Sequence, residues 1–88
     1  MKLKYSFEII DMGEELIAVP VGESANHVRG VLKMNREGAE IMQLLGSETD
    51  MKKIVDTLAS KYDNDPNSLN KFVRSFVENL RSSGLLND

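Results

Sequence analysis

Residues 5 to 34 contain three stretches whose apolar patterns predict β-strands. Residues 5–11 alternate between apolar and polar side chains, the period of a half-buried strand. Residues 14–22 hold the nearly continuous apolar run LIAVPV, in which Pro20 has no backbone N–H and is expected at a strand end, a bulge or an edge. Between these two strands, Gly13 is free to take a positive φ in a turn. The third strand, residues 28–34, places Val28, Gly30, Leu32 and Met34 on one face, and Arg29, Val31 and Lys33 on the other.

From Asn35 onward the apolar residues recur at helical spacing. Asn35 directly follows the third strand, and its side chain suits the cap of a helix over residues 36–45. Gly38 lies inside this helix at a cost of about 1 kcal/mol relative to Ala, which a close approach to the sheet or to another helix would offset. Gly46 suits the left-handed residue that follows a helix end.

Two further helices are predicted over residues 50–62 and 66–83. Thr49 is expected to cap the second helix, and Asp65 to cap the third with Pro66 in its first position. Gly84 then ends the third helix. The element order β-β-β-α-α-α indicates an α+β fold in a single domain of residues 1–88, with no helix before Asn35 and no strand after it. One core is expected from Leu32, Ile41, Ile54, Leu58, Val73, Phe76 and Leu80.

The apolar stripe of the third helix is wide. With 100° of rotation per residue, the stripe spans roughly 140° of the helix surface. Its six members are Leu69, Phe72, Val73, Phe76, Val77 and Leu80. Either all six belong to the core, or Phe72 at the border lines an apolar groove. The polar side of the same helix carries both charge signs and is interpreted first as a solvated face.

Composition narrows the function classes. The chain of 88 residues has a net charge of −3. This charge argues against nucleic acid as the partner, because a protein that binds nucleic acid is expected to have a basic face. The absence of cysteine excludes disulfides and thiolate metal sites. No apolar run has the length of a signal peptide or of the roughly 20 residues that cross a membrane. A cytoplasmic protein without a membrane partner is therefore expected.

No pattern for catalysis, a cofactor or a metal was found. The six glycines are scattered and form no phosphate-binding loop. Asp63 and Asp65 bear a faint likeness to a calcium loop, but Pro66 follows and the later Glu is missing. His27 is expected at the surface, and no serine or threonine has a suitable base and orienting group. We therefore expect no enzyme activity, no cofactor and no metal.

The chain from about Tyr5 to Leu86 resembles the PqqD family, the small proteins of pyrroloquinoline quinone biosynthesis. It is also similar to the peptide-recognition domains of pathways that modify ribosomally made peptides. The residues that carry this resemblance follow a β-hairpin region in order: VLKMN entering a helix with GAEIMQLL, then Thr49 with IVDTLASKYD, then FVRSFVENLRSSGLL. Their order and spacing together are more specific than any one piece.

The resemblance implies a winged-helix-like fold, a three-stranded antiparallel sheet packed on three helices. It also implies that the leader of a precursor peptide adds as a strand to the third strand and rests in a groove against the third helix. The domain then presents the peptide to a modifying enzyme, often a radical S-adenosylmethionine (SAM) enzyme. The peptide site on this chain would comprise the edge Val28, Arg29, Gly30, Val31, Leu32, Lys33 and Met34, and the helix residues Leu69, Phe72, Val73 and Phe76. An edge strand offers unpaired N–H and C=O groups to such a peptide.

Three features depart from the family pattern: Phe72 stands where an acidic residue is common, the spacing of LLGSETD differs, and tryptophan is absent. They favour a precursor peptide other than that of the quinone pathway. The alternative function is a winged-helix DNA-binding regulator, because a fold alone does not determine function. An unpaired strand edge also allows a homodimer by edge pairing or swapping.

Overall fold

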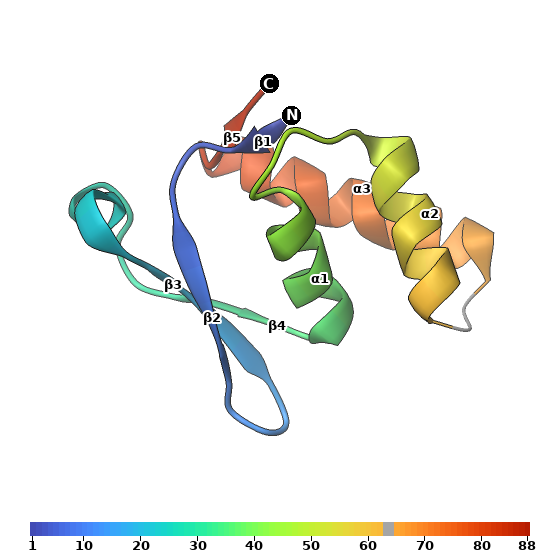
Figure 1. Cartoon of the computed structure of the whole chain (residues 1–88), viewed down its shortest axis with the longest axis horizontal. Helices are drawn as coiled ribbons and strands as arrows, with labels where there is room; N and C mark the ends of the chain where they lie inside the picture. Colours follow the sequence, from blue (N-terminus) through green and yellow to red (C-terminus); the bar gives the residue numbers. More distant parts are fainter. Residues whose placement is uncertain (63–64) are drawn as a thin grey trace.

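The computed structural model describes residues 1–62 and 65–88, so Asp63, one of the two carboxylates compared above with a calcium loop, lies outside the described residues. A three-stranded sheet precedes three helices, and the hairpin of its first two strands projects away from them (Figure 1). The strands are β2 (Phe7–Asp11), β3 (Leu16–Pro20) and β4 (Leu32–Met34). The helices are α1 (Arg36–Leu44), α2 (Met51–Lys61) and α3 (Pro66–Ser82).

The sheet has the strand order β2-β3-β4, and both pairings are antiparallel. The central strand turns Leu16 and Ala18 toward the helices, where both are buried. Pro20 is the last residue of β3, as its missing N–H requires. The α+β fold with a three-stranded antiparallel sheet and three helices is therefore confirmed.

Two small elements contradict the expectation of no helix before Asn35 and no strand after it. A 3-10 helix, η1 (Gly22–Asn26), follows β3, and a two-residue strand, β5 (Leu86–Asn87), pairs with β1 (Lys2–Leu3). Gly22 begins η1 with a φ of 60°, and the Ser24 hydroxyl accepts a hydrogen bond from the Ser6 N–H at 2.8 Å. Strands of two residues are too short to show an apolar period, so the pattern contained no signal for β1 or β5.

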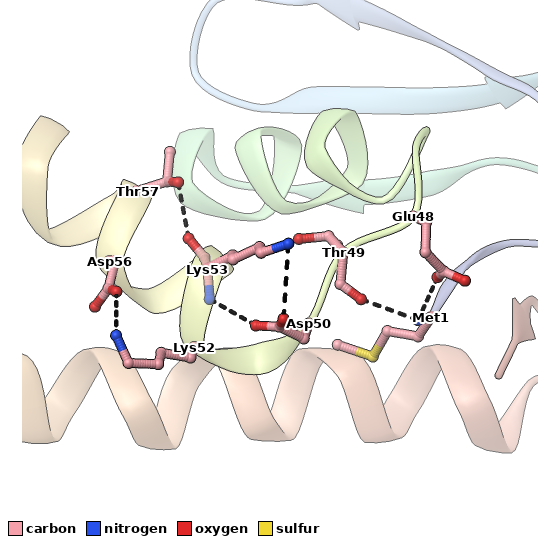
Figure 2. Close-up of polar contacts among 8 residues, drawn as sticks. All are labelled: Met1, Glu48, Thr49, Asp50, Lys52, Lys53, Asp56 and Thr57. Atoms are coloured by element: carbon pink, nitrogen blue, oxygen red, sulfur yellow. Dashed lines mark hydrogen bonds and ion pairs between the residues drawn. The ribbon is translucent and has the colours of Figure 1, made fainter.

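The helix ends agree with the sequence in part. Asn35 caps α1, and Asp65 caps α3 with Pro66 following. The cap of α2 is Asp50, not Thr49: its carboxylate accepts the Lys53 N–H at 2.9 Å (Figure 2). The prediction for Gly46 was also wrong, because the glycines with positive φ are Gly13, Gly22, Gly30 and Gly84. Carbonyls of Ile41 and Gln43 accept the N–H of Leu45 instead, which ends α1 in right-handed geometry.

The buried residues form one cluster that draws on all three helices, the sheet and the C-terminal segment. Its members are Ala18, Ile41, Met42, Leu45, Ile54, Leu58, Leu69, Val73, Val77, Leu80, Leu85 and Leu86. Two expected core residues, Leu32 and Phe76, are only half-buried and pack against this cluster. Val77 has an exposed fraction of 2%. The buried side of α3 therefore lies further toward Val77 than predicted, and Phe72 and Phe76 stand on the opposite flank.

Candidate functional site

The strand β4 is an open edge of the sheet. It pairs with β3 on one side, and no strand of the described chain pairs with its other side. In an antiparallel strand, about half of the backbone N–H and C=O groups point away from a single neighbour. The strand is shorter than the predicted 28–34, because Gly30 adopts a φ of 77° and interrupts the extended backbone before Leu32.

A cavity of about 300 Å³ lies between this edge and α3. Leu32, Lys33 and Met34 line it from the strand. The helix and the segment after it contribute Phe76, Asn79, Leu80, Ser83 and Leu85. Its floor is mostly apolar, while Asn79 and Ser83 place polar groups at its rim, as in many small binding sites. We call this space the edge groove.

A second cavity, of about 340 Å³, lies further toward the start of α3. It is lined by Glu37, Ser68, Leu69 and Phe72. The rings of Phe72 and Phe76, one helical turn apart, have centroids 5.9 Å apart and an angle of 41° between their planes. These two rings therefore connect the second cavity to the edge groove along one flank of α3.

Gly38 explains how Phe76 reaches this position. A Cβ atom on Gly38 would lie 2.7 Å from the Phe76 ring and 3.1 Å from the Met34 Cβ, both closer than normal contact. The cap of α1 is also here, since the Asn35 Oδ1 accepts the Gly38 N–H at 2.8 Å. The predicted close approach at Gly38 is thus confirmed, and it brings α1, α3 and β4 together beside the groove.

The predicted site residues divide into three groups. Leu32, Lys33, Met34 and Phe76 line the edge groove, and Leu69 and Phe72 line the second cavity. Val73 is completely buried and lines neither cavity. The remaining four precede β4, where Val28 packs on the core, and Arg29, Gly30 and Val31 are exposed.

Leu80 lines the edge groove but was predicted only as a core residue. Five other lining residues were not predicted from the sequence: Glu37, Ser68, Asn79, Ser83 and Leu85. Helix spacing alone could have identified three of them. Asn79 and Ser83 follow Phe76 by three and seven residues, and Ser68 precedes Phe72 by four. Glu37 and Leu85 come from other segments, and no pattern in the sequence signals their approach.

The charges near the groove are unevenly paired. Arg36 pairs with Asp11 at 3.3 Å. The Gly13 N–H, and then Arg36, lower the pKa of the Asp11 carboxyl. Across residues 1–62 and 65–88, Arg29 and Lys33 form no ion pair. Residues 28–34, which we call the edge segment, therefore carry two exposed cations, Arg29 and Lys33, that form no ion pair with a described residue.

One basic residue of α3 is engaged in ion pairs. Arg81 donates to Asp88 at 2.7 Å and also pairs with Glu78. These two carboxylates raise the pKa of the Arg81 guanidinium, with the Asp88 hydrogen bond as the main cause. Lys71 and Arg74 on the same helix are exposed and form no ion pair with a described residue.

In the part of the chain that the structure describes, no three His, Cys, Asp or Glu side chains lie close enough to hold a metal ion. Among the same residues, no helix has the length and apolarity needed to span a bilayer. A larger cavity, of about 460 Å³, lies between the N-terminal segment and α1, and residues of β4 do not line it. The edge groove lies directly beside the open edge of β4, which makes it the better candidate for a binding site.

The fold belongs to the class of small α+β domains that have an open edge strand beside a groove against a helix. The family model described as "Coenzyme PQQ synthesis protein D (PqqD)" matches residues 24–86. Since this match covers most of the chain, the chain belongs to the PqqD family. No curated protein matches the sequence.

A similar fold occurs in a solved structure titled "TbiB1 in Complex with the TbiA(beta) Leader Peptide". The TM-score is 0.70 at 20% sequence identity, and the alignment covers 99% of this chain and 95% of that chain. At this identity the likeness supports the fold. Together with the family match, it agrees with the resemblance inferred from the sequence.

Proposed function

We propose that the chain is a non-catalytic adaptor that binds the leader of a ribosomally made precursor peptide. The leader adds as a strand to β4, and its apolar side chains enter the edge groove and the second cavity. The main observation is the open edge of β4 with an apolar cavity directly beside it, against α3. Membership of the PqqD family and a similar fold in a leader-peptide complex support this proposal.

Strand addition divides the binding energy between two sources. Main-chain hydrogen bonds to β4 provide affinity for any extended peptide, and the side-chain cavities select among peptides. Fully burying one aliphatic or aromatic side chain contributes about 1.5–3 kcal/mol, so a few anchors suffice to discriminate. Binding of this kind depends less on salt than a set of phosphate contacts does.

We further propose that the adaptor presents the bound precursor to a modifying enzyme, such as a radical SAM protein. Only the leader occupies the groove in this arrangement, so the segment to be modified stays outside and can enter the active site of the enzyme. The adaptor itself then needs no catalytic group.

The test is an amide-shift titration of the isotope-labelled chain with a synthetic leader from a small peptide encoded beside this protein. We expect the largest shifts in Leu32–Met34 and along the Phe72 and Phe76 flank of α3. Replacing Phe72 by Asp should weaken binding at least tenfold, about 1.4 kcal/mol, because a carboxylate would have to leave water to enter an apolar cavity. The fold should persist, since Phe72 is only half-buried and can stay hydrated.

The matched control is Met12→Asp, which makes a similar apolar-to-acidic change at a side chain that is 63% exposed in the turn between β2 and β3. This variant should bind like the wild type. Normal binding by a folded Phe72→Asp variant would show that the flank of α3 is not the peptide site. Shifts confined to other strands would contradict strand addition at β4.

A further inference from the structure

The edge segment is basic in a chain whose net charge is −3. Arg29 and Lys33 are both exposed, and neither makes an ion pair with any described residue. By contrast, the neighbouring Arg36 is paired with Asp11. A partner that adds to β4 therefore meets two cations whose charge no carboxylate of the described residues offsets by an ion pair.

Alternation along β4 determines where these charges act. All three residues of β4 line the edge groove, but strand alternation directs the side chain of Lys33 to the sheet face opposite to those of Leu32 and Met34. Its partner on β3 is Ile17, which cannot neutralise it. On the same sheet face, Glu8 lies on β2, pairs with Val19, and so occupies the far edge. Glu15 directly precedes β3, and it forms no ion pair with Lys33.

We infer that the peptide bound at β4 is an amphipathic, acidic strand, with apolar residues directed into the groove and Asp or Glu on the outward face near Lys33 and Arg29. This inference rests on the proposed function and specifies the chemistry of its ligand. Side chains directly opposite each other on antiparallel strands have Cβ atoms about 4.5–5.5 Å apart, so opposite charges attract and like charges repel.

The same two cations would also disfavour pairing of the open edge with the β4 of a second copy. If a second copy added its β4 to this edge, lysines and arginines of both copies would come together and repel. An acidic strand would instead be attracted. One pair of side chains thus rejects the wrong partner and favours the right one, which is a common way to obtain specificity.

The experiment uses two synthetic peptides with the same alternating Leu and Val positions. One carries Glu at the intervening positions, and the other carries Lys. Affinities are measured for the wild type, for Arg29→Glu/Lys33→Glu, and for a control, Lys71→Glu/Arg74→Glu. The control changes the net charge equally but lies on α3 at exposed positions that line neither cavity of the groove side.

The wild type should prefer the Glu peptide by about tenfold, because the cross-strand partner of Lys33 is attractive in the Glu peptide and repulsive in the Lys peptide. Arg29 precedes β4 and adds to this difference as a nearby exposed charge. The Arg29→Glu/Lys33→Glu variant should prefer the Lys peptide, and the Lys71→Glu/Arg74→Glu control should keep the wild-type preference. High salt should reduce the preference while binding itself persists, because exposed charges are screened and apolar contacts are not.

The outcomes separate this inference from the proposed function. If both peptides bind at Leu32–Met34 with equal affinity, strand addition stands and the acidic preference is overturned. If the control variant also reverses the preference, net charge and not the edge segment selects the peptide, which overturns the inference as well. If neither peptide shifts the β4 amides, both the inference and strand addition fail.

Discussion

At the scale of single residues, Gly38 allows α1 to pack closely against the site. A Cβ atom at this position would lie 2.7 Å from the Phe76 ring and 3.1 Å from the Met34 Cβ. In an open helix, Ala in place of Gly would stabilise by about 1 kcal/mol. Here the gain competes with overpacking, which typically costs about 1–3 kcal/mol.

We predict that Gly38→Ala lowers the free energy of unfolding by about 1 kcal/mol instead of raising it, because a Cβ atom only 2.7 Å from the Phe76 ring would force this packed ring to shift. Urea unfolding measures this change. In a Phe76→Leu background the nearest atom is gone, so the same substitution should become neutral or stabilising. A stabilising effect of Gly38→Ala in the wild type would show that the ring moves aside freely.

At the scale of elements, the start of α2 offers a direct test of the structure against the sequence pattern. The Asp50 carboxylate accepts the Lys53 N–H at 2.9 Å. The backbone carbonyl of Thr49 accepts a hydrogen bond from the Met1 N–H₃⁺ at 2.9 Å, while its side chain makes no capping bond (Figure 2). Thr and Asp are both good caps, so adjacent candidates cannot be separated by residue type.

Asp50→Ala should therefore cost about 1 kcal/mol of stability, the usual loss for removing a side-chain cap. Thr49→Ala, the matched control one residue earlier, should cost much less. Thermal unfolding of both variants, followed by helical circular dichroism, gives the comparison. A larger loss of stability for Thr49→Ala than for Asp50→Ala would show that Thr49 caps α2, as the sequence suggested.

The helices and the longer strands could be predicted because each repeats its apolar period several times. The buried side of α3 could not be predicted in the same way, because Phe72, Phe76 and Val77 are all apolar and lie on one broad stripe. Only tertiary packing decides that Val77 faces the core while the two rings flank β4. Similarly, Gly30 shortens β4 through a positive φ that alternation does not reveal.

At the scale of the whole molecule, the two ends of the described chain lie side by side (Figure 1). Leu85 and Leu86 join the core with exposed fractions of 7% and 9%. The Lys4 N–H donates to the Leu85 carbonyl at 2.8 Å, and Leu85 also lines the edge groove. The edge groove thus depends on a segment that lies after the last helix, which is why its floor could not be read from α3 alone.

The double variant Leu85→Ala/Leu86→Ala should consequently lose most of its stability. Each buried Leu→Ala change typically costs about 2–5 kcal/mol, against about 5–15 kcal/mol for a whole domain. Removing the exposed Asn87 and Asp88 is the control, and it should change stability little because their contacts are at the surface. Urea unfolding of both proteins measures the difference.

The single variants should differ in peptide binding. Leu85→Ala should weaken binding more than Leu86→Ala, because Leu85 lines the edge groove. Equal affinities of the two variants for the leader would show that the C-terminal segment is not part of the peptide site.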